Sequence, residues 1–307
     1  MSKKNQIGGV IKMQSIINCY ATDRKNIGDS LSSPLNYFEL PGAKIEKLDI
    51  RLPVKAEELE GKHIILGGGG LLFPRFLPEI ATIINARKRK KLIAWGIGQQ
   101  IYVRKKGKLF PREITDEAIN SFDYSYLENF DLVGIRDFGI LGYDWLPCAS
   151  CMHKSFDKKR EIKHEFVVFS HKKFLLNIEN FPRLTNECND MEKVLDFLGS
   201  GETVLTSSYH GVYWATLLGR KVLAFPFSSK FYTLKHKPNM YPVELWLRKK
   251  KSFIERLNFR YKNKFYFPST NSWQSLLKDS QSYPESLEEC RHKNQLYYSK
   301  VMEFMEL

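Results

Sequence analysis

A histidine, His210, lies where the sequence predicts that a strand gives way to a helix. A polar run at 206–211 follows the apolar residues 203–205 and precedes a helical segment at 212–218; residues 221–225 again read as a strand. This order is the repeating unit of a parallel α/β sheet, whose ligands bind where strands end and helices begin. His210 is therefore a candidate titrating group beside an anionic ligand. The alternative is a helix-capping serine and threonine cluster with an incidental histidine.

Four consecutive glycines, Gly67–Gly70, follow a buried-type strand at 63–66. Glycine lets the backbone approach a ligand closely and present its N–H groups, so Gly68 and Gly69 are candidate donor contacts. The run matches neither the lysine-containing phosphate loop nor the dinucleotide-binding pattern, so it does not specify a nucleotide. The alternative is tight packing between the strand and a helix expected at 71–87.

The first predicted strand, 16–20, is followed by a loop that contains Asn26 and Asp29. Amide and carboxylate groups at a strand end are suited to bind the hydroxyls of a sugar-like ligand. The alternative is that Asp29 caps the helix expected at 30–38, after the tight turn that Gly28 permits.

Two cations follow later strands. Arg136 ends the strand at 131–135, and a guanidinium binds carboxylate or phosphate through two hydrogen bonds. Its alternative is a surface ion pair with Asp137 or another acid. Lys230 follows the last strand of the histidine segment and can offer a point charge to phosphate, or remain a solvated lysine.

Strands alternate with helices along the chain, which predicts an α/β fold. We expect two Rossmann-like domains, residues 1–150 and 164–307, joined by a charged linker near 150–163. The second domain includes a basic and aromatic insertion at 248–264, which we interpret as a solvated segment rather than a nucleic-acid or membrane contact. A terminal helix is expected at 287–304.

Length and composition fit a globular protein: 307 residues, 43% hydrophobic, with a formal net charge of +14. The charge predicts an anionic partner but does not choose among phosphorylated metabolites, polysaccharide, nucleic acid and membrane. Five cysteines without regular spacing indicate no disulfide framework. Cys148 and Cys151 form a C-x-x-C pair with no second pair to complete a metal site, so we expect structural cysteines and no metal.

No stretch of the chain has the pattern of a secretory signal or a transmembrane helix. The first residues are polar and basic, and no apolar run reaches about 18 residues. We therefore expect a cytoplasmic protein with at most peripheral contact at the inner face of the membrane.

Taken in order, these motifs resemble the polysaccharide pyruvyl transferase family. The segments that carry the resemblance span about residues 16–231 and are Asn26-Ile27-Gly28-Asp29, Gly67–Gly70, Gly96-Ile97-Gly98-Gln99, Arg136-Asp137, Ser207–Gly211 and Lys230. The order and spacing of these motifs along the chain carry the resemblance.

The resemblance implies a GT-B-like fold, in which two Rossmann-like domains face a cleft. It also implies transfer of pyruvate from phosphoenolpyruvate onto two hydroxyls of a sugar to form a cyclic ketal, with no cofactor. The acceptor is then an oligosaccharide or a lipid-linked glycan of a surface polysaccharide, and nucleic acid is not a partner. The implied site residues are His210 as the acid, Arg136, Lys230, Ser207, Ser208, Gly68 and Gly69 toward the donor, and Asn26 and Asp29 toward the acceptor.

Two departures from the family pattern leave other functions open. Ser208 stands where the family commonly has an arginine, so Lys230, Arg220 or a lysine at 235–237 must replace that cation if the donor is the same. Cys148 lies where members often carry an acidic turn. The alternatives are a glycosyltransferase that uses a nucleotide sugar and a non-catalytic protein that binds glycans or anions.

Overall fold

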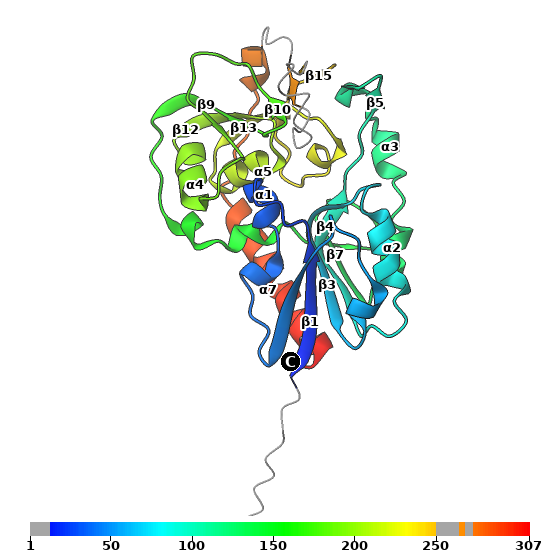
Figure 1. The fold of residues 1–307 in the computed structure, drawn as a ribbon. Coiled ribbons are helices and arrows are strands. Elements are labelled where there is room, and N and C mark those ends of the chain that lie inside the picture. The colour runs from blue at the N-terminus through cyan, green and yellow to red at the C-terminus, as the bar shows by residue number, and fades with distance from the viewer. Residues whose placement is uncertain (1–12, 250–263, 268–272) are drawn as a thin grey trace, which may run out of the picture.

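The chain forms a mixed α/β fold with two separate parallel sheets (Figure 1), as expected from the alternating pattern. The computed structural model describes residues 13–249, 264–267 and 273–307. The first sheet has six strands in the order β2-β1-β3-β4-β7-β8, and every neighbouring pair is parallel. Its strands are β1 (Gln14–Tyr20), β2 (Ala43–Asp49), β3 (His63–Leu72), β4 (Leu92–Gln99), β7 (Leu132–Ile135) and β8 (Asp144–Trp145).

The second sheet has five strands in the order β11-β9-β12-β13-β14, again all parallel. Its strands are β9 (His164–Ser170), β11 (Arg183–Thr185), β12 (Gly201–Thr206), β13 (Lys221–Ala224) and β14 (Asn239–Met240). Two smaller sheets pair β5 (Arg104–Lys105) with β6 (Lys108–Leu109), and β16 (Phe265–Tyr266) with β10 (Phe174–Leu175) and β15 (Leu247–Arg248).

Apolar side chains point to both faces of the first sheet, so that a separate core lies on each face. Ile64 and Leu66 of β3 face one core, and Ile65 between them faces the other, because successive side chains of a strand point to opposite faces. Helix α2 (Leu77–Asn85) covers the first face through Ile80 and Ile83. Helices α4 (Met191–Gly199) and α5 (Tyr209–Leu217) belong to the core of the second sheet, and the short α3 (Asp116–Asn120) follows the β5–β6 hairpin.

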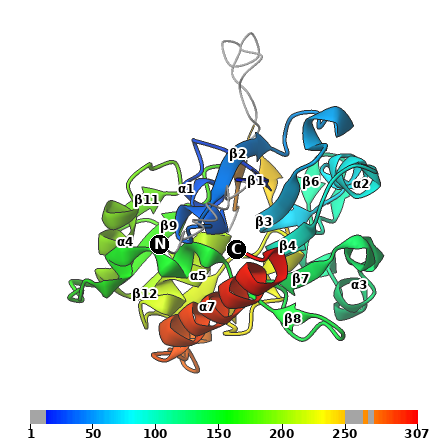
Figure 2. The ribbon, with the colours of Figure 1, turned by 90° about the horizontal axis from the view of Figure 1, so that it is seen from below.

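The C-terminal helix α7 (Ser286–Met305) contributes to the cores of both sheets (Figure 2). Near its start, Ser286 donates a hydrogen bond to the carbonyl of Thr216 in α5. Near its end, Tyr297 donates to the carbonyl of Ala94 in β4, and Val301 packs in the core of the first sheet. We had placed this helix in the second domain, and the structure shows that its C-terminal half packs on the first sheet.

Several predicted elements differ from those observed. The glycine run lies inside β3 instead of in a loop after it, and β4 likewise runs on through Gly96 to Gln99, with register shifts in both strands. The helix expected at 71–87 is shortened to 77–85, since the strand occupies its first residues. The one expected at 30–38 is a single turn, α1 (Ile27–Ser30), followed by a 3-10 turn that starts at Pro34.

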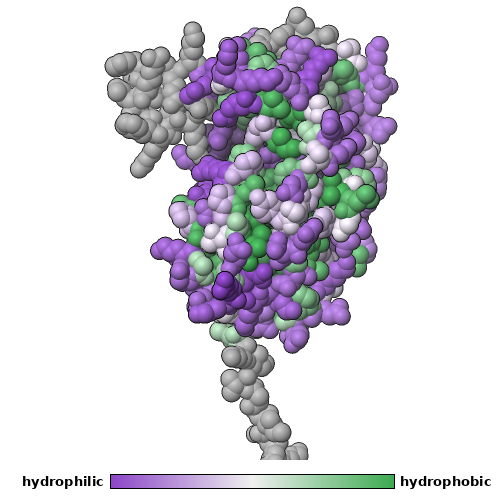
Figure 3. Space-filling model, turned by 90° about the vertical axis from the view of Figure 1, so that its right-hand side faces the viewer, coloured by the Kyte–Doolittle hydropathy of each residue, from purple (hydrophilic) through white to green (hydrophobic). Residues whose placement is uncertain are grey.

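The face on the α2 and α3 side of the molecule is mainly hydrophilic, with apolar residues in smaller groups (Figure 3). Within the part of the chain that the structure describes, no helix combines the length and apolarity needed to cross a membrane. Most of the basic segment expected at 248–264 lies outside the described residues.

Candidate functional site

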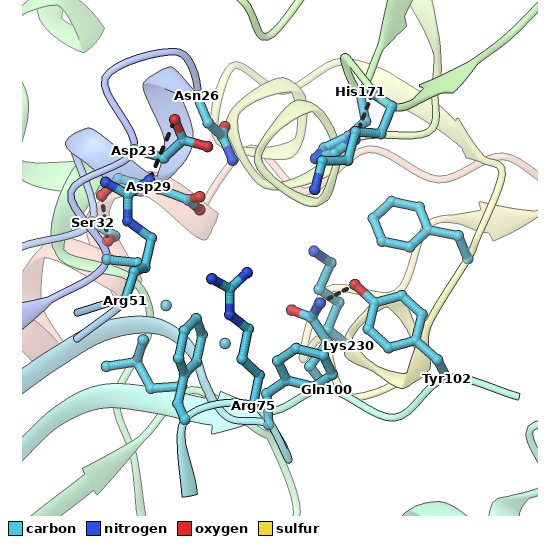
Figure 4. Close-up of a pocket in the computed structure, with 18 of the residues that line it drawn as sticks. Asp23, Asn26, Asp29, Ser32, Arg51, Arg75, Gln100, Tyr102, His171 and Lys230 are labelled. Carbon is cyan, nitrogen blue, oxygen red and sulfur yellow. Dashed lines mark hydrogen bonds and ion pairs between the residues drawn. The ribbon is translucent and has the colours of Figure 1, made fainter. Parts of the chain in front are cut away.

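A cavity of about 880 Å³ lies where the carboxyl ends of the two sheets come together. Its walls are formed by the end of β3 and by the segments that follow β1, β2, β3 and β4 of the first sheet and β9 and β13 of the second. Figure 4 shows polar side chains from these segments converging on one space. Ligands of open parallel sheets bind outside the carboxyl ends of the strands, so we take this cavity as the candidate site.

Lys230, the predicted contact for an anion, lines this cavity. It lies in a 3-10 turn after β13, with its Nζ 4.7 Å from the centre of the Phe227 ring and 5.7 Å from that of Tyr209. Among the described residues it forms no ion pair. Burial, and then the nearby Arg136 guanidinium, lower the pKa of Lys230 to about 7. An anion in the cavity would restore its charge, which makes this position suited to phosphate or carboxylate.

Asn26 and Asp29, the predicted acceptor contacts, line the same cavity from the β1 side. Burial raises the pKa of the Asp29 carboxyl, and the Lys230 ammonium is the strongest influence that opposes the rise. Asn26 is largely buried, and its Oδ1 accepts a hydrogen bond of 2.7 Å from Nδ2 of Asn186, which follows β11. Asn26 therefore joins the two sheets at the cavity wall, and Asp29 is the more open of the two.

Arg136 is buried behind the cavity. Its guanidinium carbon lies 4.3 Å from the centre of the Tyr209 ring, and its Nε and Nη2 have no hydrogen-bond partner in the described part of the chain. A Cβ added to Gly70, which lines the cavity, would lie 2.9 Å from Nη2 of Arg136 and 2.6 Å from Oε1 of Gln100, so the Arg136 guanidinium lies close behind the cavity wall. The alternative pairing with Asp137 is not formed. That carboxylate instead accepts hydrogen bonds from the Gln99 N–H and the hydroxyls of Tyr124 and Thr233.

His210 is not brought to the cavity surface. It lies in the first turn of α5, and its ring sits directly under α1, where a Cβ added to Gly28 would come within 2.1 Å of Nδ1. Its Nε2 is 3.6 Å from the Sγ of Cys148. Burial, with the charges of Arg136 and Lys230, holds the pKa of His210 well below its usual range, so the imidazole is neutral at pH 7.

The predicted serines also point into the protein. Ser208 is the N-cap of α5 and accepts a hydrogen bond from the Gly211 N–H, as in the capping interpretation. Ser207 accepts from the His171 N–H and donates to the Phe174 carbonyl, which fixes the turn after β9. Both hydroxyls are buried, and neither residue lines the cavity.

Gly68 and Gly69 do line the cavity, and the glycine run also meets a packing need. A Cβ on Gly67 would lie 2.3 Å from the Trp95 carbonyl oxygen, and one on Gly68 would lie 2.4 Å from that of Ser32. Gly69 has a φ of +106°, a conformation that side-chain-bearing residues rarely adopt. Gly68 and Gly69 therefore line the cavity, while the close packing of Gly67 and Gly68 is against Trp95 of β4 and Ser32 rather than against the helix expected at 71–87.

Our sequence reasoning missed the segment His171-Lys172-Lys173, which follows β9 and lines the cavity. Nδ1 of His171 accepts a hydrogen bond from the Lys173 N–H, which leaves the proton of the neutral ring on Nε2. Burial, and then the ammonium groups of Lys230, Lys173 and Lys172, hold the pKa of His171 well below its usual range. The sequence carries a signal for it, because the predicted strand at 166–170 ends directly before this histidine and its two lysines.

Two of the three suggested replacements for the missing family arginine lie elsewhere. Arg220 donates hydrogen bonds to the carbonyls of Gly199 and Arg160, and Lys235 pairs with Glu289. Lys230 alone of the three reaches the cavity, together with additional cations that the sequence did not single out. These lining cations are Arg51, Arg75, Arg104, Lys172 and Lys173.

The C-x-x-C pair is buried. Cys148 and Cys151 are free thiols, and burial raises the pKa of each. Within residues 13–249, 264–267 and 273–307, no group of three or more His, Cys, Asp and Glu side chains is arranged to hold a metal ion.

Comparison with protein-family models finds no match, and comparison with curated proteins finds none. Among solved structures, the chain is similar to a functionally uncharacterized protein from Klebsiella pneumoniae, with 17% sequence identity and a TM-score of 0.38. The match covers 70% of this chain and 84% of that protein. It assigns neither a family nor an activity to the chain.

Proposed function

We propose that the protein transfers pyruvate from phosphoenolpyruvate onto two hydroxyls of a sugar, forming a cyclic ketal and releasing inorganic phosphate. The observation that carries the proposal is that a cation and a carboxylate lie across one cavity from each other: Lys230 on the β13 side, which forms no ion pair with any residue that the structure describes, and Asp29 on the β1 side. The cation suits the phosphate and carboxylate of the donor, and the carboxylate suits the hydroxyls of the acceptor.

The reaction requires three bond changes at C2 of the donor. A proton added to the methylene carbon makes C2 an oxocarbenium-like centre, which the first sugar hydroxyl attacks. The C2–O bond to phosphate then breaks, and the second hydroxyl attacks C2 to close the ring. Two hydroxyl protons are released, one proton is taken up by carbon and one by phosphate, so the proton count balances.

The donor side of the cavity provides the charges that this chemistry needs. Lys230 and Lys173 line it beside His171, and Arg136 adds positive potential from behind Gly70. Burial and then the neighbouring ammonium groups lower the pKa of His171, and an anionic donor would offset the part due to those charges and so favour the protonated form. His171 is therefore our candidate proton donor from the cavity wall. The same role for His210 requires α1 to move off its ring.

A donor panel tests the proposal. Thermal unfolding is measured with phosphoenolpyruvate, inorganic phosphate, UDP-sugars and CMP-sugars, since a ligand at 100 times its Kd stabilises by about 2.7 kcal/mol. We expect a shift with phosphoenolpyruvate, and phosphate release from it only when a sugar acceptor is present. A shift with nucleotide sugars alone would favour a glycosyltransferase, and a shift with oligosaccharide alone would favour a glycan-binding protein.

The proposal extends to the arrangement and setting of the protein. We propose that the two sheets belong to two domains in a GT-B-like arrangement, with the cavity as the cleft between them. The acceptor is an oligosaccharide or a lipid-linked glycan used for a surface polysaccharide of the cell envelope. The enzyme then works in the cytoplasm, at the inner face of the membrane when the acceptor is lipid-linked.

A further inference from the structure

Three carboxylates line the cavity, and they differ in their partners. Asp49 is held by Arg51, with an Nη2 to Oδ2 distance of 2.7 Å, and Asp23 is held by Lys172 at 2.9 Å. Asp29 forms no ion pair with any described residue. It is the carboxylate of this cavity that remains available to a ligand.

The proton affinities of these carboxylates follow from the same contacts. Hydrogen bonds from Arg51 and Thr22 outweigh burial at Asp49 and hold its pKa well below its usual range, which makes it a poor proton acceptor. At Asp29, burial instead raises the pKa. The charged and titratable groups that act on or respond to Asp29 come from every wall of the site: Asp23, Arg51, Tyr102, Cys148, Lys172 and Lys230.

The position of Asp29 is fixed from the second sheet. The Asn186 carbonyl accepts a hydrogen bond from the Ile27 N–H, and its side chain donates to Oδ1 of Asn26. The Asn26 side chain, held by Asn186, also favours the charged form of the Asp29 carboxyl and so moderates the rise in its pKa. Asp29 is thus aimed at the space in front of Lys230 (Figure 4).

From this arrangement we infer that Asp29 is the catalytic residue that takes the proton from the attacking hydroxyl of a sugar diol, an inference that rests on the proposed function. The hydroxyl oxygen bonds to C2 as its proton moves to the Asp29 carboxylate. The protonated carboxyl returns that proton to the phosphate oxygen as the C2–O bond breaks. The restored carboxylate then accepts the proton of the second hydroxyl as the ring closes, and this proton passes to solvent to balance the one delivered to carbon.

The test compares Asp29→Asn with Asp29→Glu, and with Asp144→Asn as a control at an exposed ion pair with Lys300. Phosphate release from phosphoenolpyruvate with a sugar diol is followed at several pH values, beside donor binding and thermal unfolding. We expect Asp29→Asn to lower kcat by about 100-fold or more, to leave donor affinity within a few-fold, and to lose the acidic limb of the pH profile. Asp29→Glu retains part of the rate and the limb, and Asp144→Asn behaves as wild type.

The inference is overturned when wild type transfers pyruvate and Asp29→Asn keeps its kcat and acidic limb. It also fails when the loss of kcat in Asp29→Asn is matched by an equal loss of donor affinity. A third refuting result is an Asp29→Glu variant that is folded but as inactive as Asp29→Asn and lacks the acidic limb of the pH profile. Absence of transfer by wild type, in contrast, refutes the proposed function itself and the inference with it.

Discussion

Binding of phosphoenolpyruvate is expected to weaken as the pH rises above neutrality, because Lys230 loses its proton in the free protein. The pKa of Lys230 is lowered to about 7, mainly by burial and by Arg136. A bound phosphate or carboxylate favours the ammonium form and raises this pKa, so binding takes up a proton. Between these two pKa values, affinity falls about tenfold, or about 1.4 kcal/mol, for each pH unit.

Isothermal titration between about pH 7.5 and pH 9.5 measures this effect, since the second ionisation of the donor phosphate, with a pKa of about 6, is complete there. We expect Kd to rise by about 100-fold over the range, with uptake of close to one proton when buffers of different ionisation enthalpy are compared. Lys230→Arg is the matched control. A guanidinium stays charged throughout, so its binding should vary little with pH.

Two results would refute this reasoning. A wild-type Kd that changes by less than about threefold over those two pH units would mean that Lys230 is not the charge that holds the donor. An equal slope in Lys230→Arg would place the titrating group elsewhere in the cavity.

The remaining predictions concern stability and the two histidines. Lys230→Met is expected to stabilise the fold at pH 7 by about 1 kcal/mol or more, measured by urea unfolding, because it removes a buried amine whose pKa is lowered in the folded state. Between pH 7 and about 10.5 the unfolded wild type binds more protons than the folded wild type, so wild-type stability rises with pH in that range. A variant less stable than wild type at pH 7 would contradict this. Gly28→Ala would place a Cβ 2.1 Å from Nδ1 of His210 and is expected to cost about 1–3 kcal/mol, measured as a lowered Tm, whereas an unchanged Tm would show that α1 moves freely. We expect His171→Asn to reduce phosphate release by about 100-fold, because His171 lines the cavity. His210→Asn is expected mainly to lower the Tm, because His210 does not line the cavity. If His210→Asn lost transfer at unchanged stability, His210 and not His171 would be the proton donor.

The parallel α/β fold was predictable because buried strands are short apolar runs that end in polar turns. The same rule predicts that Lys230 and Asp29 come together, since both lie in segments that follow strands whose carboxyl ends meet at the cavity. Strand ends were harder to define where glycine is frequent. Gly67–Gly70 reads as a loop from its composition, yet close backbone packing keeps it within β3.

The sequence did not predict the direction in which the side chains of the candidate site residues point. His210 occupies the expected position at a helix start, but the helix turn points its ring under Gly28. Ser208 is used by its own helix as a cap, which local sequence favours equally well. Whether such a residue faces ligand or protein depends on α1, which packs over it from a segment about 180 residues earlier in the chain.

The packing of α7 on both sheets has a consequence for folding. The last 20-residue helix contributes Cys290 to the core of the second sheet and Val301 and Met305 to that of the first. Neither sheet completes its core until α7 has been synthesised. A chain cut near residue 150 would therefore leave the first sheet with an uncovered apolar face, and heating the whole protein is expected to melt both sheets in one cooperative transition.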